Sequence, residues 1–90
     1  MTLSEFPSNR ADVAQLLLDV GAVVDYQNNM GMTALHRAAL KGAKGVARVL
    51  LRRGARPEIN NKHGLSAVDL AEVGSDVRDT IVKAQLKRGR

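Results

Sequence analysis

The sequence predicts an all-α fold, a short solenoid of stacked antiparallel helix pairs joined by turn-rich finger loops. The main observation is a repeat at a spacing of 33 residues: residues 31–38 resemble residues 64–71, and residues 46–55 resemble residues 13–22. A fixed period of this size is typical of stacked repeat proteins. The second observation is that apolar residues within each copy follow helical spacing, and glycines separate the copies.

The first predicted helix covers residues 11–20. Its apolar residues are spaced i, i+3, i+4, i+7 and are expected to form one face: Val13, Leu16, Leu17 and Val20. Ser8 or Asn9 is expected to cap its start, and Gly21 to end it in a left-handed conformation.

The second helix pair follows the same plan. Thr33 is the expected N-cap of a short helix over residues 34–41, in which the small Ala38 and Ala39 let neighbouring helices approach closely. Gly42 is expected to end that helix. An outer helix then opens at residues 46–51, with Val46, Val49 and Leu50 directed inward.

The third pair is more divergent. Ser66 is expected to cap a short helix over residues 67–73, and residues 76–86 predict a longer helix with Val77 and Ile81 on its apolar face. The polar residues of this segment suit the end of a stack, where the outer face meets water. Residues 87–90 are expected to be disordered.

Residues 31–55 resemble the ankyrin repeat, whose pattern reads G-x-T-P-L-H-x-A-A-x-x-G and then V-V-x-L-L-L-x-x-G-A; Ala34 stands where the family usually has Pro. The resemblance covers about residues 11–82. It implies a single domain over residues 1–90, with a partial repeat (about 1–27), a full repeat (about 28–60) and a divergent C-terminal capping repeat (about 61–90). It also implies two hairpin-like fingers, with Asn28 and Asn61 at matching turn positions.

Composition narrows the function. The chain has 90 residues, a net charge of +5 and no cysteine. No apolar run is long enough to span a bilayer and no signal peptide is recognisable, so we expect no membrane association and an intracellular location, in the cytoplasm or nucleus.

Positive charge is concentrated in the middle of the chain. The stretch from Tyr26 to Pro57 has no acidic residue and carries seven cations: Arg37, Lys41, Lys44, Arg48, Arg52, Arg53 and Arg56. Two interpretations of these cations stay open: ordinary solvated helix faces, or a band that attracts an acidic partner. Nucleic-acid binding is disfavoured, because Phe6 and Tyr26 are the only aromatic residues that could stack on bases.

Nothing in the sequence predicts an enzyme, a cofactor or a metal site. The two histidines, His36 and His63, fall on different elements with no cysteine and no carboxylate at ligand spacing, and there is neither a nucleophile elbow nor a phosphate loop. His36 is expected to be structural, bonding Thr33 and nearby backbone and so tying one finger to the next. His63 is expected to face solvent on the second finger.

The resemblance implies a non-catalytic protein–protein interaction module that binds its partner through the finger tips and the concave face of the inner helices. Met30, Met32, Leu40 and Leu65 are apolar where the fold does not require it. The nearby cations Arg37, Lys41 and Lys62 favour acidic or mixed acidic and apolar segments of a partner. The predicted contact residues are Gln27, Asn29, Met30, Met32, Arg37, Leu40, Lys41, Arg53, Asn60, Lys62, His63 and Leu65. The competing interpretation is that these are ordinary scattered surface residues.

The N-terminal end of the predicted stack lacks an inner helix, which leaves Leu16 and Leu17 uncovered on one side. Three explanations stay open: the chain is a fragment of a longer array, residues 2–6 form a lid with Leu3 and Phe6, or two copies pair as a homodimer. The alternative function is therefore a structural or self-associating fragment that dimerises through this end.

Overall fold

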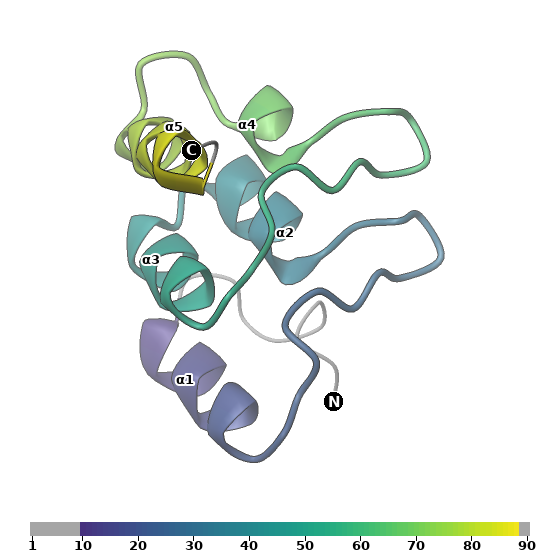
Figure 1. Cartoon of the computed structure of the whole chain (residues 1–90), viewed down its shortest axis with the longest axis vertical. Coiled ribbons are helices and arrows are strands. Elements are labelled where there is room, and N and C mark those ends of the chain that lie inside the picture. The colour runs from purple at the N-terminus through teal and green to yellow at the C-terminus, as the bar shows by residue number, and fades with distance from the viewer. Residues whose placement is uncertain (1–9, 89–90) are drawn as a thin grey trace.

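The computed structural model describes residues 10–88. Within this range the chain forms helices joined by turns, and no strand is present (Figure 1). The helices are α1 (Ala11–Asp19), α2 (Ala34–Lys41), α3 (Lys44–Arg52), α4 (Ala67–Leu70) and α5 (Asp76–Arg88). The predicted all-α class is confirmed.

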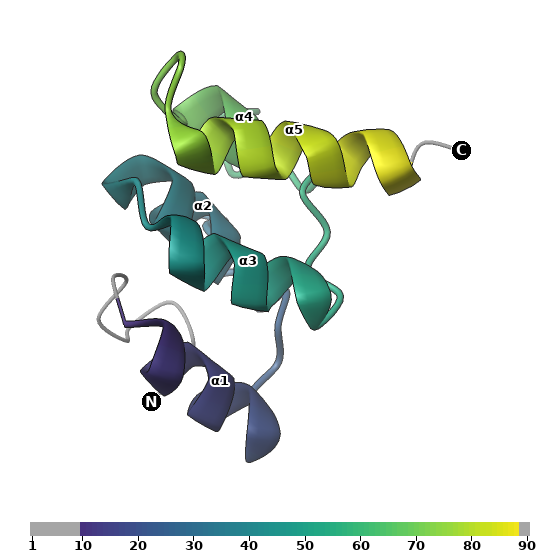
Figure 2. The same cartoon turned by 90° about the vertical axis from the view of Figure 1, so that its left-hand side faces the viewer.

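The helices form two layers. The outer layer is a row in which α3 lies between α1 and α5, as Figure 2 shows. The inner layer consists of α2 and α4, which pack on each other and on the outer helices α3 and α5. The loops before α2 and before α4 extend away from the outer row as two adjacent fingers (Figure 1). This arrangement is the translated stack of helix pairs that the sequence period predicted.

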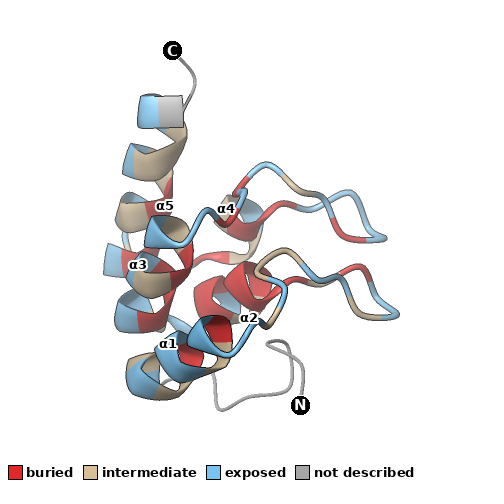
Figure 3. Ribbon diagram, turned by 60° about the horizontal axis from the view of Figure 1, so that its bottom comes forward, coloured by how far each residue is buried: buried red, intermediate tan, exposed pale blue. Residues whose placement is uncertain are grey.

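The hydrophobic core lies between the two layers, where the buried residues gather in Figure 3. Its largest fully buried apolar side chains are Leu35, Leu50, Ile81, Val46 and Val77. Burying each of these contributes roughly 1.5–3 kcal/mol. Buried alanines of α2 and α3 bring the helices close together, as the sequence predicted for Ala38 and Ala39.

Three helices end in the same way. Gly21, Gly42 and Gly54 have φ angles of 101°, 70° and 93°, a left-handed region that glycine adopts without a steric cost. In each case the following alanine donates its backbone N–H to the carbonyl five residues back, at 2.8–2.9 Å: Ala22 to Leu17, Ala43 to Ala38 and Ala55 to Leu50. The predicted glycine terminators Gly21 and Gly42 are confirmed, and Gly54 ends α3 with the same hydrogen bond.

The predicted apolar face of α1 was wrong for Leu16 and Val20 and right in part for Val13 and Leu17, which pack against the core. Ala14 and Leu18 are buried against α3, Val13 and Leu17 are half-buried, and Leu16 and Val20 are 62% and 73% exposed. The reason is that α1 packs on α3 and on no other described helix. A helix that packs on one neighbour buries only a narrow strip of its surface. In α1 this strip contains Ala14 and Leu18, which lie one helical turn apart and face α3.

Several helix boundaries differ from the predicted ones. α3 begins at Lys44 rather than at residue 46. α4 ends at Leu70 rather than at residue 73, because Ala71 is extended (φ −75°, ψ 139°). α5 continues to Arg88, so Lys87 is helical and not disordered, whereas residues 89–90 lie outside the described range.

The start of α1 is not capped by a side chain of the residue before it. Arg10 is the N-cap residue, and its guanidinium instead pairs with the Asp12 carboxylate at 2.9 Å. The predicted caps Ser8 and Asn9, and a lid made of Leu3 and Phe6, lie outside the described residues.

Candidate functional site

The tips of the two fingers have the same hydrogen-bonded turn. The Asn28 side-chain oxygen accepts from the backbone N–H groups of Met30 (2.9 Å) and Met32 (3.0 Å). The Asn61 oxygen accepts in the same way from His63 (2.8 Å) and Leu65 (3.1 Å). Asparagine is favoured here because its short side chain can satisfy its own downstream backbone. The predicted matching roles of the two asparagines are confirmed.

Backbone and side-chain bonds hold the two fingers together. The Lys62 N–H donates to the Met30 carbonyl at 3.0 Å. The Gln27 side-chain amide donates to the carbonyls of Gly31 (3.0 Å) and Asn60 (3.2 Å). Gln27, predicted as a partner contact, therefore braces the fingers. The two loops form one rigid edge rather than two independent loops.

His36 connects the inner helix to the second finger. Its Nδ1 accepts from the Thr33 backbone N–H at 3.0 Å, so Nε2 carries the proton and donates to the Leu65 carbonyl at 2.9 Å. In return, the Thr33 hydroxyl oxygen accepts from the His36 backbone N–H, which caps α2. The ring is buried and fully bonded, which confirms the structural role predicted for this histidine.

The end of α4 nearest the fingers has a related cap. The Asp69 carboxylate accepts from the Ser66 backbone N–H (2.9 Å) and from its hydroxyl (3.1 Å). These bonds, aided by the charge of Arg78, hold the pKa of Asp69 below its usual value. Asp69 takes the place of His36 in the second copy, so a carboxylate performs the capping that the ring performs in the first.

Several predicted contact residues meet in one shallow hollow. It has a volume of about 310 Å³, lies between the first finger and α2, and is lined by Asn28, Met32, Arg37, Leu40 and Lys41. Leu40 is 58% exposed there. Met32 is half-buried, and its sulfur accepts from the Asn61 amide at 3.3 Å, so it helps to shape the hollow as well as line it.

The remaining predicted contacts are distributed along the fingers, except for one. Met30 and Leu65 are 49% and 38% exposed, and Asn29, Asn60, Lys62 and His63 are also exposed there. Arg53 does not join them. It lies at the C-terminal end of α3 in the outer row and pairs with Asp19 of α1 at 2.6 Å. Arg53 was predicted as a partner contact from its position in the repeat, which does not show that it pairs with an aspartate of a neighbouring outer helix.

The basic stretch predicted from the sequence is divided between two sides of the fold. Arg37 and Lys41 lie on α2 in the finger-side hollow, whereas Lys44, Arg48 and Arg52 lie along α3 beside α5. The second group was named in the basic stretch but was not included in the predicted contact residues. Its spacing of four residues, which places side chains on one helix face, was the signal that could have found it.

Within residues 10–88 there is no cluster of three or more histidines and carboxylates that could hold a metal ion. No helix in the same range combines the length and the apolar character needed to cross a membrane.

Comparison with known proteins gives the same architecture. A family model described as ankyrin repeats (many copies) matches residues 17–71. The crystal structure of the human ASB11 ankyrin repeat domain superposes with a TM-score of 0.75 at 35% identity, covering 83% of this chain and 34% of that one.

Curated relatives are much longer proteins. The chain is 44% identical over 62 residues to the ADP-ribosylation factor GTPase-activating protein AGD2 of Arabidopsis thaliana, covering 68% of this chain and 8% of the relative. It is 35% identical over 68 residues to the human 2-5A-dependent ribonuclease, covering 74% of this chain and 9% of that protein. The chain thus spans less than a tenth of the length of these two relatives.

The stacked helix pairs and the paired fingers agree with these comparisons. Domains of this kind are generally non-catalytic and bind other proteins. We conclude that this chain belongs to the ankyrin-repeat family.

Proposed function

We propose that this chain binds a partner protein across its finger tips and the adjoining face of α2. The observation that carries this proposal is the set of apolar side chains left exposed beside the fingers: Met30, Leu40 and Leu65. The fold does not use these side chains in its core. Apolar residues clustered around a hollow mark an interface more often than isolated ones do.

The preferred partner segment is acidic and apolar. Arg37 and Lys41 line the same hollow as Leu40, and Lys62 is exposed on the second finger. An apolar centre with a cationic rim matches a segment that carries the opposite charge. Because the fingers are hydrogen-bonded to each other, the surface is preorganised and little entropy is lost when it binds.

A surface variant tests this proposal. Met30→Ser, Leu40→Ser and Lys41→Glu together remove the exposed apolar groups and reverse one rim charge. We expect affinity for a partner, identified by affinity capture and then measured with purified protein, to fall at least about tenfold. The melting temperature should stay nearly constant, because Met30, Leu40 and Lys41 are all exposed.

The control variant changes other exposed apolar residues. Val73→Ser and Leu86→Ser lie away from the fingers, after α4 and near the end of α5, and are expected to leave binding unchanged. Normal binding by the finger variant, or equal loss in both variants, would show that the partner uses a different surface.

A second candidate function is self-association through α1. Leu16, Val20 and Val23 are exposed, and α1 has only α3 as a helical neighbour among the described residues. Two such ends placed together would bury this apolar surface. Sedimentation over a range of concentrations tests it: the wild type is expected to dimerise and Leu16→Ser/Val20→Ser to remain monomeric. A wild type that stays monomeric at high concentration excludes this function.

A further inference from the structure

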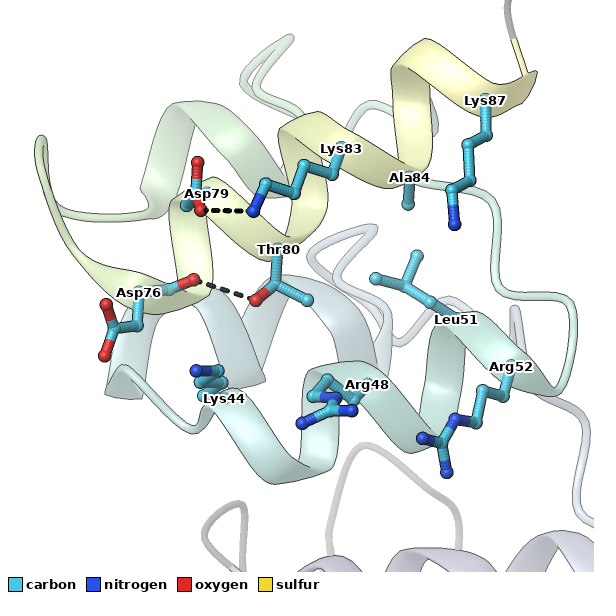
Figure 4. Close-up of a pocket in the computed structure, with 10 residues that line it drawn as sticks. All are labelled: Lys44, Arg48, Leu51, Arg52, Asp76, Asp79, Thr80, Lys83, Ala84 and Lys87. Atoms are coloured by element: carbon cyan, nitrogen blue, oxygen red, sulfur yellow. Dashed lines mark hydrogen bonds and ion pairs between the residues drawn. The ribbon is translucent and has the colours of Figure 1, made fainter.

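A second recognition surface lies on the outer row of helices, on α3 and α5. A groove of about 500 Å³ runs between these two helices, whereas the fingers extend from the other side of the fold (Figures 1 and 4). It is lined by Lys44, Arg48, Leu51, Arg52, Asp76, Asp79, Thr80, Lys83, Ala84 and Lys87. No residue of this groove belongs to the predicted partner-binding set.

The cations of the groove are arranged in two rows. Lys44, Arg48 and Arg52 follow one another at intervals of four residues along α3, and Lys83 and Lys87 do so on α5. Lys83 pairs with Asp79 at 3.2 Å, but the other four cations form no ion pair within residues 10–88. Like charges one helical turn apart repel each other, so these rows of cations do not stabilise the fold.

The floor of the groove is apolar. Figure 4 shows Leu51 of α3 pointing toward Ala84 of α5, and both side chains are half-buried. The Thr80 hydroxyl donates to the Asp76 carbonyl at 2.9 Å, which leaves its methyl group for contact with a ligand. A ligand that fits this groove therefore needs apolar as well as negative groups.

Charge is uneven along the groove. Asp76 and Asp79 lie toward the end that contains Lys44, and the other end carries Arg48, Arg52 and Lys87 without a carboxylate (Figure 4). A uniformly charged polyanion such as a nucleic acid would be repelled by the two aspartates. The groove lining also contains no aromatic side chain on which bases could stack.

We propose that this groove binds a short acidic and apolar segment of a partner protein. The carboxylates of the bound segment lie beside Arg48, Arg52 and Lys87, and one of its apolar side chains contacts Leu51 and Ala84. The proposal is independent of the finger surface, because the two sites share no residue. A module with two such surfaces can hold two protein segments at once.

Fluorescence anisotropy with three labelled peptides tests the proposal. The probe is a helical peptide with Glu and Leu on one face, and the two control peptides replace every Glu by Gln or every Leu by Ser. We expect the Glu and Leu peptide to bind, with an affinity that falls as salt is raised, and each control peptide to bind at least about tenfold more weakly.

Matched charge reversals locate the site. Arg48→Glu/Arg52→Glu is expected to weaken peptide binding at least about tenfold, whereas Arg10→Glu/Arg56→Glu, which makes the same charge change at exposed residues that line neither the groove nor the finger-side hollow, should alter it less than about twofold. A peptide with Lys in place of Glu should bind the Arg48→Glu/Arg52→Glu variant more tightly than the wild type. Arg48→Gln/Arg52→Gln removes the two positive charges without reversing them and is expected to weaken binding less. Circular dichroism checks that every variant is folded.

Three results would overturn the proposal. One is that the Glu and Leu peptide does not bind the folded wild type. Another is equal loss of binding in the Arg48→Glu/Arg52→Glu and Arg10→Glu/Arg56→Glu variants, which would indicate only a response to net charge. The third is tighter binding to a single-stranded oligonucleotide than to the peptide, with the same dependence on Arg48 and Arg52. None of these outcomes bears on the finger surface, because none of the variants changes a residue proposed to bind there.

Discussion

Two glycines at matching positions of the two fingers provide a controlled test of how the stack is held together. Gly31 and Gly64 both have φ +76°. A Cβ atom at Gly31 would lie 2.8 Å from the Lys62 backbone nitrogen and 3.1 Å from the Asn61 Cα, whereas a Cβ at Gly64 would meet nothing within 4 Å. The substitutions Gly31→Ala and Gly64→Ala therefore differ in the neighbouring finger and not in backbone conformation.

The expected difference in stability follows from these contacts. Each alanine pays the left-handed backbone cost of about 1–2 kcal/mol, which cancels in the comparison. Gly31→Ala must also push the fingers apart, because the new Cβ atom would be too close to the backbone of Lys62. Backbone atoms can move away only if the second finger moves with them. It weakens the Lys62–Met30 and Gln27–Asn60 hydrogen bonds, 3.0 and 3.2 Å long. At about 1 kcal/mol for each bond, Gly31→Ala should cost about 2 kcal/mol more than Gly64→Ala.

Urea and thermal unfolding followed by circular dichroism measure this difference. For a domain of this size, about 2 kcal/mol corresponds to a difference in Tm of about 8–16 °C. Equal destabilisation by the two substitutions would refute the reasoning, since it would mean that the fingers do not support each other. A larger loss in Gly64→Ala would contradict it more strongly.

Three further predictions concern other parts of the fold. His36→Ala should cost about 2–3 kcal/mol in urea unfolding, because it leaves the Leu65 carbonyl and the Thr33 N–H without their partner, while His63→Ala on the exposed finger should cost little. The lowered pKa of Asp69 stabilises the fold above the unfolded carboxyl pKa, and this contribution disappears as pH falls through the folded value. Asp69→Asn should therefore reduce the fall in Tm at acidic pH. An unchanged fall would show that the Asp69 carboxylate does not stabilise the fold. Arg48→Glu should raise stability by about 1 kcal/mol by replacing two repulsive i, i+4 pairs on α3 with attractive ones, and a lower Tm would count against the proposed repulsion.

Much of this fold is determined by local sequence. The 33-residue period, the glycine at each helix end and the Thr33 cap predicted the helix pairs and their order. These features depend on interactions within a few residues, such as the Thr33–His36 cap and the left-handed Gly42. Asn28 and Asn61 likewise indicated their turns, because an asparagine side chain bonds to backbone two and four residues ahead. Local hydrogen-bonding chemistry of this kind can be predicted from the sequence alone.

The faces of the helices were decided by tertiary structure. Leu16 and Val20 follow a helical apolar pattern, but they are exposed because, within residues 10–88, α1 has one helical neighbour and fully buries only Ala14 and Leu18. Periodicity gives the spacing of apolar residues, whereas the number and position of neighbouring helices decide which of them lose contact with water. Arg53 was misplaced for the same reason, since its ion pair depends on where Asp19 lies in the stack.

The basic residues show the same division most clearly. The composition of residues 26–57, with seven cations and no acidic residue, can be read directly from the amino-acid sequence. The packing of the helices separates five of the seven, placing Arg37 and Lys41 in a finger-side hollow on α2 and Lys44, Arg48 and Arg52 in an outer groove between α3 and α5. The physical reason is that α2 and α3 run in different layers, so side chains a few residues apart in the chain point to opposite sides of the domain.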